Sequence, residues 1–146
     1  MSILGEDTPA VRGGHVLAEA SGGRPEVVLI ADGGEEPVAL RAREILEAEG
    51  SPTRVVSMPC PARFERQGRE YRERVLPREA VVRVSVGAGA SLGWYALAGQ
   101  AGAPVGLAGA GLAAPYQTLY EQVAFAAERV AAQARQGLAK ARDRAA

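Results

Sequence analysis

The sequence has few of the residues from which catalytic and metal sites are usually built. It contains one cysteine, Cys60, and one histidine, His15, in 146 residues. A single cysteine excludes an internal disulfide and fits a reducing cytoplasm. A metal site usually needs three or four clustered ligands, and the sequence has no such cluster. We therefore expect this chain to bind no metal.

Neither charge of one sign nor long apolar runs are present in excess. The chain has 17 basic and 17 acidic residues, so its formal net charge is zero. Nucleic-acid-binding domains usually carry a basic excess, and we expect no nucleic-acid partner. No apolar run approaches the roughly 18 residues that span a membrane. The first residues lack the basic and apolar segments of a signal peptide. We therefore expect no membrane association and a cytoplasmic location.

What is present is an ordinary globular composition, with 47% hydrophobic and 23% charged residues. The length suits one domain. The apolar run Val27–Ala31 is typical of a strand buried on both faces, as in parallel sheets. Further strands are expected at His15–Ala20, Thr53–Ser57, Val81–Val86 and Val105–Leu107.

Helical patterns separate the expected strands. One helix is predicted from about Glu35 to Glu49, because Gly50 is a good helix stop. The charged segment Arg63–Arg74 predicts one or two short helices with a solvated face, and a last helical pattern begins at Pro115. Alternating strands and helices predict a three-layer α/β/α sandwich with a mainly parallel sheet. We assign residues 1–14 to an N-terminal arm or linker, 15–136 to the domain and 137–146 to a frayed helical tail.

Two glycine-rich segments are candidate nucleotide sites. Gly87–Gly93 follows a strand, but its G-x-G-x-x-x-G spacing is one residue longer than the dinucleotide fingerprint. No acidic residue lies about 20 positions further on, where a ribose would need one. Gly106–Gly111 lacks the Lys-Ser or Lys-Thr of a phosphate loop. We interpret the first segment as a tight turn and the second as a flexible connection.

Asp32 and Cys60 are the other candidates. Asp32 lies at the carboxyl end of a predicted strand, where α/β proteins place their sites. An aspartate before glycine more often makes a turn or caps a helix, and we favour that reading. Cys60 is a candidate thiol nucleophile, but the one histidine, His15, is 45 positions away. The sequence therefore predicts no catalytic, cofactor-binding or metal-binding residue.

Several segments, in order, resemble the C-terminal domain of transketolase. Arg54–Cys60 (RVVSMPC) and Tyr71–Pro77 (YRERVLP) carry most of the resemblance. Further matching segments are Arg12–Leu17, Leu29–Glu35, Gly93–Tyr95, and Pro115 with Leu119. The resemblance extends from about residue 11 to residue 134.

The resemblance implies a five-stranded mixed, mostly parallel sheet with the first strand antiparallel. It also implies a context, because transketolases hold thiamine diphosphate and magnesium on two other domains. The chain would then be a non-catalytic domain or subunit of a thiamine-diphosphate-dependent transketolase-like enzyme. It would contribute assembly and dimer contacts to ketol transfer between sugar phosphates. The implied partners are the cofactor-binding domains or subunits, in a homo- or hetero-oligomer.

Departures from the family's pattern gather after the fourth and fifth expected strands. Gly or Ala replaces charged, aromatic or hydroxyl residues there, at Gly87, Ala96, Ala108–Gly111 and Ala113. Elsewhere Pro61 replaces a tryptophan, and Val123–Ala126 replaces a Phe-Gly-Phe-Thr break. The segments expected in the core are kept. We therefore expect the family's fold with an altered interface.

Two other functions stay open. The chain could be a free-standing binding or regulatory module that has lost its catalytic partner domains, or a small enzyme that uses Asp32 or Cys60. Neighbouring genes for the cofactor-binding domains would favour the subunit, and their absence would favour the module. The small enzyme would require an activity that is lost on Asp32→Asn or Cys60→Ser.

Overall fold

The apolar runs of the sequence form the strands of one sheet. The computed structural model describes residues 12–87, 105–106 and 116–145. Its strands are β1 (His15–Ala18), β2 (Val27–Ala31), β3 (Thr53–Ser57), β4 (Val82–Gly87) and β5 (Val105–Gly106). Its helices are α1 (Glu36–Ala48), α2 (Pro61–Glu65), α3 (Arg69–Val75) and α5 (Tyr116–Ala145), with 3-10 turns at Ser21–Gly23 and Gly33–Glu35.

The sheet has the mixed topology that the resemblance implies. Its strand order is β1-β3-β2-β4-β5. β1 pairs antiparallel with β3, and the other neighbouring strands pair in parallel. The predicted antiparallel first strand is therefore confirmed. The expected fifth strand is present only as the two residues of β5, which extend a body of four longer strands.

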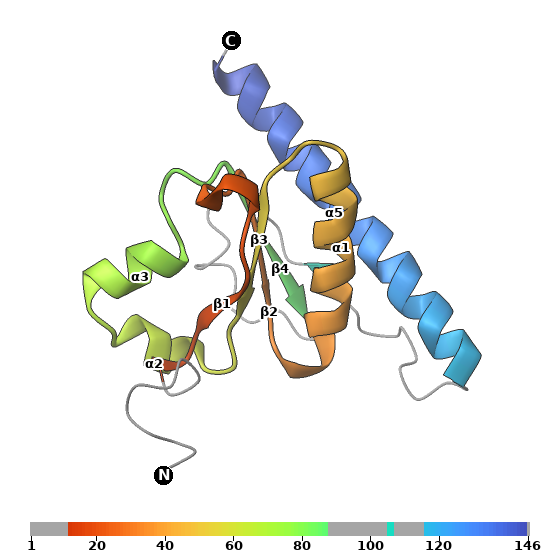
Figure 1. Ribbon diagram of the computed structural model, residues 1–146, viewed down its shortest axis with the longest axis horizontal. Coiled ribbons are helices and arrows are strands. Elements are labelled where there is room, and N and C mark those ends of the chain that lie inside the picture. The colour runs from red at the N-terminus through yellow and green to blue at the C-terminus, as the bar shows by residue number, and fades with distance from the viewer. Residues whose placement is uncertain (1–11, 88–104, 107–115, 146) are drawn as a thin grey trace.

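Alternate residues of β2 face two separate cores, as a strand buried on both faces requires. Val27, Leu29 and Ala31 pack with α1 and α5, whereas Val28 and Ile30 pack with α2 and α3. Figure 1 shows α1 beside α5 and the short helices α2 and α3 on the other side of the sheet. The predicted three-layer α/β/α sandwich is confirmed.

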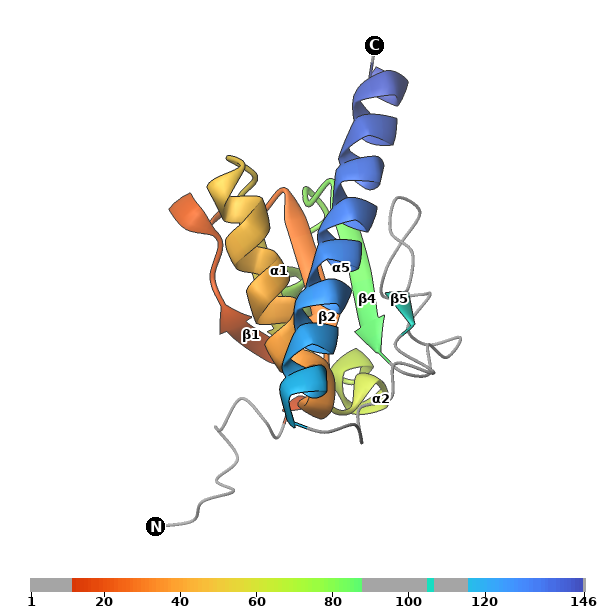
Figure 2. The same ribbon diagram turned by 90° about the vertical axis from the view of Figure 1, so that its right-hand side faces the viewer.

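The first core depends on small residues of α5. Ala127, Ala131 and Ala134 are fully buried, which lets α5 lie close against α1 and β4 (Figure 2). α5 is continuous through Val123–Ala126, the segment that replaces the family's expected break. Among the residues that the structure describes, no helix has both the length and the apolar character to cross a membrane.

The helix boundaries follow the predicted signals closely. α1 lies within the predicted range, and Gly50 beyond it adopts a left-handed φ of 87°. The charged segment forms two short helices, as predicted. α2 ends at Glu65, and Gly68 is the N-cap residue of α3. The boundary predicted at residue 137 falls inside α5, and Leu138 beyond it is still buried. The division into arm, domain and tail stays a prediction.

Candidate functional site

The carboxyl edge of the sheet is the first place to look for a site. Asp32 follows β2 there and is half-buried. Its backbone carbonyl accepts a hydrogen bond from the Glu35 amide at 2.8 Å, which closes the turn into α1. Asp32 therefore lies in a turn, which is the interpretation that the sequence favoured, since an aspartate before a glycine commonly makes a turn.

Cys60 lies beyond β3 at the same edge and is exposed. It precedes α2, and its carbonyl accepts hydrogen bonds from the amides of Arg63 and Phe64, each at 3.1 Å. Its own amide donates to the Gly13 carbonyl at 3.0 Å. The backbone of Cys60 therefore starts α2 and holds the N-terminal segment. No hydrogen bond joins its thiol to His15 within the described part of the chain.

A side-chain pair that the sequence analysis missed lies near His15. His15 on β1 is the direct partner of Ser57 on β3. The Ser57 hydroxyl donates to Glu36 Oε2 at 2.9 Å, whereas His15 Nδ1 is buried without a hydrogen-bond partner. A nucleophilic serine needs a base hydrogen-bonded to it and a group that orients the base. Here the serine proton points to a carboxylate, so these three residues do not form that relay.

The glycine-rich candidates lie mostly outside the described residues. Gly87 ends β4, and Gly106 lies in β5, where the two are direct partners. Residues 88–93 and 107–111, the rest of the two segments, fall outside. So do Ala96 and Ala113, at which the interface was expected to be altered.

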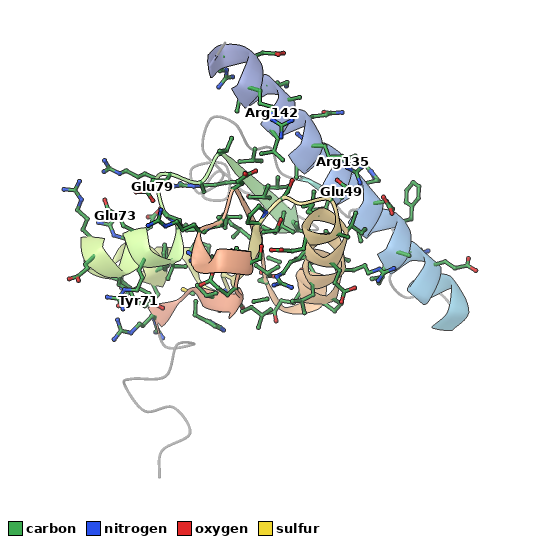
Figure 3. The ribbon with its side chains drawn as sticks, turned by 45° about the horizontal axis from the view of Figure 1, so that its top comes forward. Glu49, Tyr71, Glu73, Glu79, Arg135 and Arg142 are labelled. Carbon is green, nitrogen blue, oxygen red and sulfur yellow. The ribbon has the colours of Figure 1, made fainter. Side chains whose placement is uncertain are left out.

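A clamp fixes the chain where it enters the domain. The Tyr71 hydroxyl donates to the Gly14 carbonyl at 2.8 Å, and the Arg12 guanidinium lies 4.6 Å from the Tyr71 ring centre. Tyr71 extends from α3 (Figure 3). Gly13 has a φ of 84°, and a Cβ there would lie 2.4 Å from the Cys60 carbonyl oxygen. The clamp thus holds residues 12–14 against α2 and α3.

At the amino edge of the sheet a buried arginine is paired with a carboxylate. The Arg54 side chain is only 7% exposed, and its Nε lies 2.8 Å from Glu19 Oε1. Arg54 Nη1 also donates to the carbonyls of Arg74 and Val75 at the end of α3. Burial alone would raise the pKa of Glu19. The hydrogen bonds from Arg54 and the Ala20 amide, with nearby arginine charges, hold it below its ordinary value.

A cavity of about 560 Å³ opens beside Arg54. Its lining mixes both signs of charge, from Arg24, Arg54, Arg74, Glu73 and Glu79. Arg54 is already paired with Glu19, as above. A cavity with this mixed lining selects no single class of ligand by charge.

A comparison with known families decides what the chain is. Residues 13–126 match the family model described as the transketolase-like TK C-terminal domain. The chain belongs to this transketolase family. The match includes β1 to β5 and the beginning of α5.

Individual transketolases agree with this assignment. Transketolase 2 of Escherichia coli is 46% identical over 123 residues, which are 84% of this chain and 18% of that protein. The transketolase structure from Leishmania mexicana is 33% identical with a TM-score of 0.69, over 87% of this chain and 18% of that one. The chain thus spans less than a fifth of the length of these two transketolases.

A shorter neighbour is a split-gene transketolase described as an inactive β4 tetramer. It shares the fold at a TM-score of 0.60 and 24% identity. This chain covers 42% of it, so that neighbour also carries more than this domain.

Proposed function

We propose that this chain is the non-catalytic C-terminal domain or subunit of a thiamine-diphosphate-dependent transketolase-like enzyme. It contributes assembly and dimer contacts to an enzyme that transfers ketol units between sugar phosphates, the chemistry of the pentose phosphate pathway. The match to a transketolase C-terminal domain over residues 13–126 carries this proposal. The enzyme operates in the cytoplasm, where the exposed Cys60 thiol stays reduced.

The described residues offer no cluster of ligands for a magnesium ion. Magnesium prefers several oxygen ligands, usually with carboxylates among them. No three histidine, cysteine or carboxylate side chains gather into a metal-binding group in residues 12–87, 105–106 and 116–145. Glu36 at the carboxyl edge already accepts the Ser57 hydroxyl. On the kinship with transketolases, we assign thiamine diphosphate and magnesium to the other domains of the enzyme, and no chemical step to this chain.

The proposed contribution to assembly is to hold a fixed geometry. The clamp at Gly13 and Tyr71 holds the start of the described chain against α2 and α3. A partner domain or subunit that docks beside the clamp would meet a surface of fixed shape. The split-gene neighbour is a precedent for this fold in a chain separated from the rest of the enzyme. On that precedent we propose a homo- or hetero-oligomer with cofactor-binding domains or subunits.

The test is to reconstitute the enzyme around this chain. The tagged full chain is used to capture partners from its native cell extract, with the tag alone as control. We expect recovery of chains that carry the cofactor-binding domains, together with ketol-transfer activity that requires thiamine diphosphate and magnesium. Removing this chain from the eluate should abolish that activity. Recovery of the chain alone, inert with both cofactors, would overturn the proposal in favour of the free-standing module.

A further inference from the structure

Two arginines occupy equivalent places in the sheet but differ in their partners. Arg54 on β3 and Arg83 on β4 both pair in register with Val28 on β2. Both donate to carbonyls at the end of α3, Arg83 through Nη2 to Leu76 at 3.3 Å and Pro77 at 3.0 Å. Arg54 has the carboxylate of Glu19 beside it. Arg83 forms no ion pair with a carboxylate of the described residues.

The sequence limits where such a carboxylate could come from. Of the residues outside the description, segments 88–104 and 107–115 contain no aspartate or glutamate, and residues 1–11 contain only Glu6 and Asp7. Arg83 is half-buried, and this burial, followed by the charge of Arg78, lowers its pKa below the ordinary value. A partly buried cation without a counter-charge is unfavourable. An anion beside Arg83 would remove this cost.

The groove at Arg83 has the charge to hold such an anion. It has a volume of about 220 Å³ and is lined by Arg69, Arg72, Glu73, Leu76, Arg78 and Arg83. Four guanidinium groups thus surround one carboxylate. Glu73 Oε1 is shared, lying 3.1 Å from Arg69 Nε and 3.5 Å from Arg78 Nε. Figure 3 shows Glu73 on α3, at the edge of the domain.

Arg72 supplies a second guanidinium that no carboxylate of the described residues neutralises. Its Nε donates to the Gln67 carbonyl at 3.1 Å, which leaves its terminal nitrogens for another acceptor. The planar fork of an arginine matches the oxygens of a phosphate group. The groove is smaller than the roughly 300–1,000 Å³ of pockets for drug-sized ligands. Its size suits a small anion or the charged end of a larger molecule.

We propose that this groove is a binding site for a phosphate group, with Arg72 and Arg83 as its main donors. Arg69 and Arg78 at the rim add positive charge, and Glu73 opposes binding. The phosphate can be inorganic phosphate or the terminal group of a phosphate monoester.

The experiment titrates the full chain with inorganic phosphate and, in a second arm, with glycerol 3-phosphate. Binding is followed by calorimetry and by thermal stabilisation at constant ionic strength, with chloride as the reference salt. We expect both phosphates to stabilise the chain beyond chloride. Equal affinity would identify the phosphate group alone as the ligand. Tighter binding of glycerol 3-phosphate would show that the organic part also contributes.

Variants distinguish a specific phosphate site from a general attraction of phosphate to positive surface charge. Arg72→Gln and Arg83→Gln should each weaken phosphate binding about tenfold or more, since each removes charged hydrogen bonds. Glu73→Gln should tighten binding several-fold. Arg41→Gln is the matched control, because Arg41 lies on α1 and is 60% exposed. If Arg83→Gln does not fold, Arg72→Gln and Glu73→Gln decide alone.

Two results would overturn the proposal. One is phosphate stabilising the wild-type chain no more than chloride does. The other is Arg41→Gln losing as much affinity as Arg72→Gln, with no gain in Glu73→Gln.

Discussion

At the residue scale, the strongest constraint is on Gly13. Its positive φ is costly for any residue with a Cβ, and backbone atoms of Cys60 and Phe64 would lie 2.4 and 2.5 Å from that Cβ. Neither contact can be relieved by moving a flexible side chain. The start of the domain therefore depends on the absence of a single carbon atom.

Gly13→Ala should lower the free energy of unfolding by about 2–4 kcal/mol, from the left-handed conformation plus backbone clashes. Gly22→Ala is the matched control, because Gly22 has a φ of 75° with nothing within 4 Å of its added Cβ. It should cost only about 1 kcal/mol. Urea unfolding measures both. Equal losses in the two variants would show that the close approach at Gly13 is unimportant.

The pair of Glu19 and Arg54 is the second residue-scale prediction. Glu19→Gln leaves the buried Arg54 without its counter-charge. Removing one partner of a fully buried pair costs about 3–5 kcal/mol. The Glu19 side chain is 48% exposed, so solvent screening reduces our estimate to about 1–2 kcal/mol. Glu44→Gln, in an exposed pair with Arg41, should change stability by less than about 0.5 kcal/mol.

The pH dependence of this effect has a definite sign. The pKa of Glu19 is lowered on folding, so its stabilising contribution is present above the ordinary value of 4.5. That contribution is lost as the pH falls through the folded-state pKa. The stability difference between wild type and Glu19→Gln should therefore shrink in acid. A difference that grows below pH 4.5 in urea unfolding curves would contradict the pairing.

At the scale of elements, α5 depends on small buried residues against α1. Ala131→Leu should destabilise the fold by about 1–3 kcal/mol, because extra methyl groups overpack a filled core. Ala124→Leu on the same helix is the control, since Ala124 is exposed. It should be close to neutral. The urea midpoint at unchanged m-value reports both, and similar losses at the two sites would disprove this packing of α5.

α1 and α5 are also joined at their surface. Arg135 on α5 forms a two-pronged ion pair with Glu49 just beyond α1, and Figure 3 shows the two facing each other. The hydrogen bond from Arg135 lowers the pKa of Glu49, and the same bond raises the pKa of Arg135. Both side chains are exposed, so the alanine contacts beneath dominate the association of the helices.

At the scale of the molecule, the last helix completes the first core. Val130, Ala131, Ala134 and Leu138 of α5 are buried with residues of β2, β4 and α1. A chain shortened to end at Lys140 keeps all four and should unfold cooperatively near the wild-type temperature. A chain that ends at Arg129 should lose cooperative thermal unfolding, because such a deletion removes most of a stability of about 5–15 kcal/mol. Circular dichroism melting compares the two, and cooperative unfolding of the shorter chain would contradict this role.

Much of the fold could be predicted because apolar patterns are local. The run Val27–Ala31 is β2 as predicted, and Thr53–Ser57 is β3. The predicted helix from about residue 35 to 49 is α1, since a stop signal such as Gly50 acts on adjacent backbone. The antiparallel direction of β1 came from the family resemblance, not from the residues of the strand itself.

Contacts between side chains that are distant in the sequence could not be predicted in the same way. Arg72 belongs to a segment interpreted as a solvated face, and nothing in the sequence connects it with Arg83. Likewise, Ser57 and Glu36 are 21 positions apart, and their hydrogen bond could not be predicted. Asp32 and Cys60 were candidates only because of the residues next to them in the sequence. These contacts depend on how strands register and helices pack, which a one-dimensional pattern does not encode.

The sequence by itself determined the class of fold, most element boundaries and the resemblance to transketolase. These follow from propensity and hydrophobic periodicity, which act over a few residues. Only the tertiary structure decided which charges are paired. It placed Arg54 beside Glu19 and left Arg83 in a groove of arginines. The reason is that a charge interacts through space with the groups that folding brings within a few ångströms of it. The residues next to it in the sequence do not determine which groups those are.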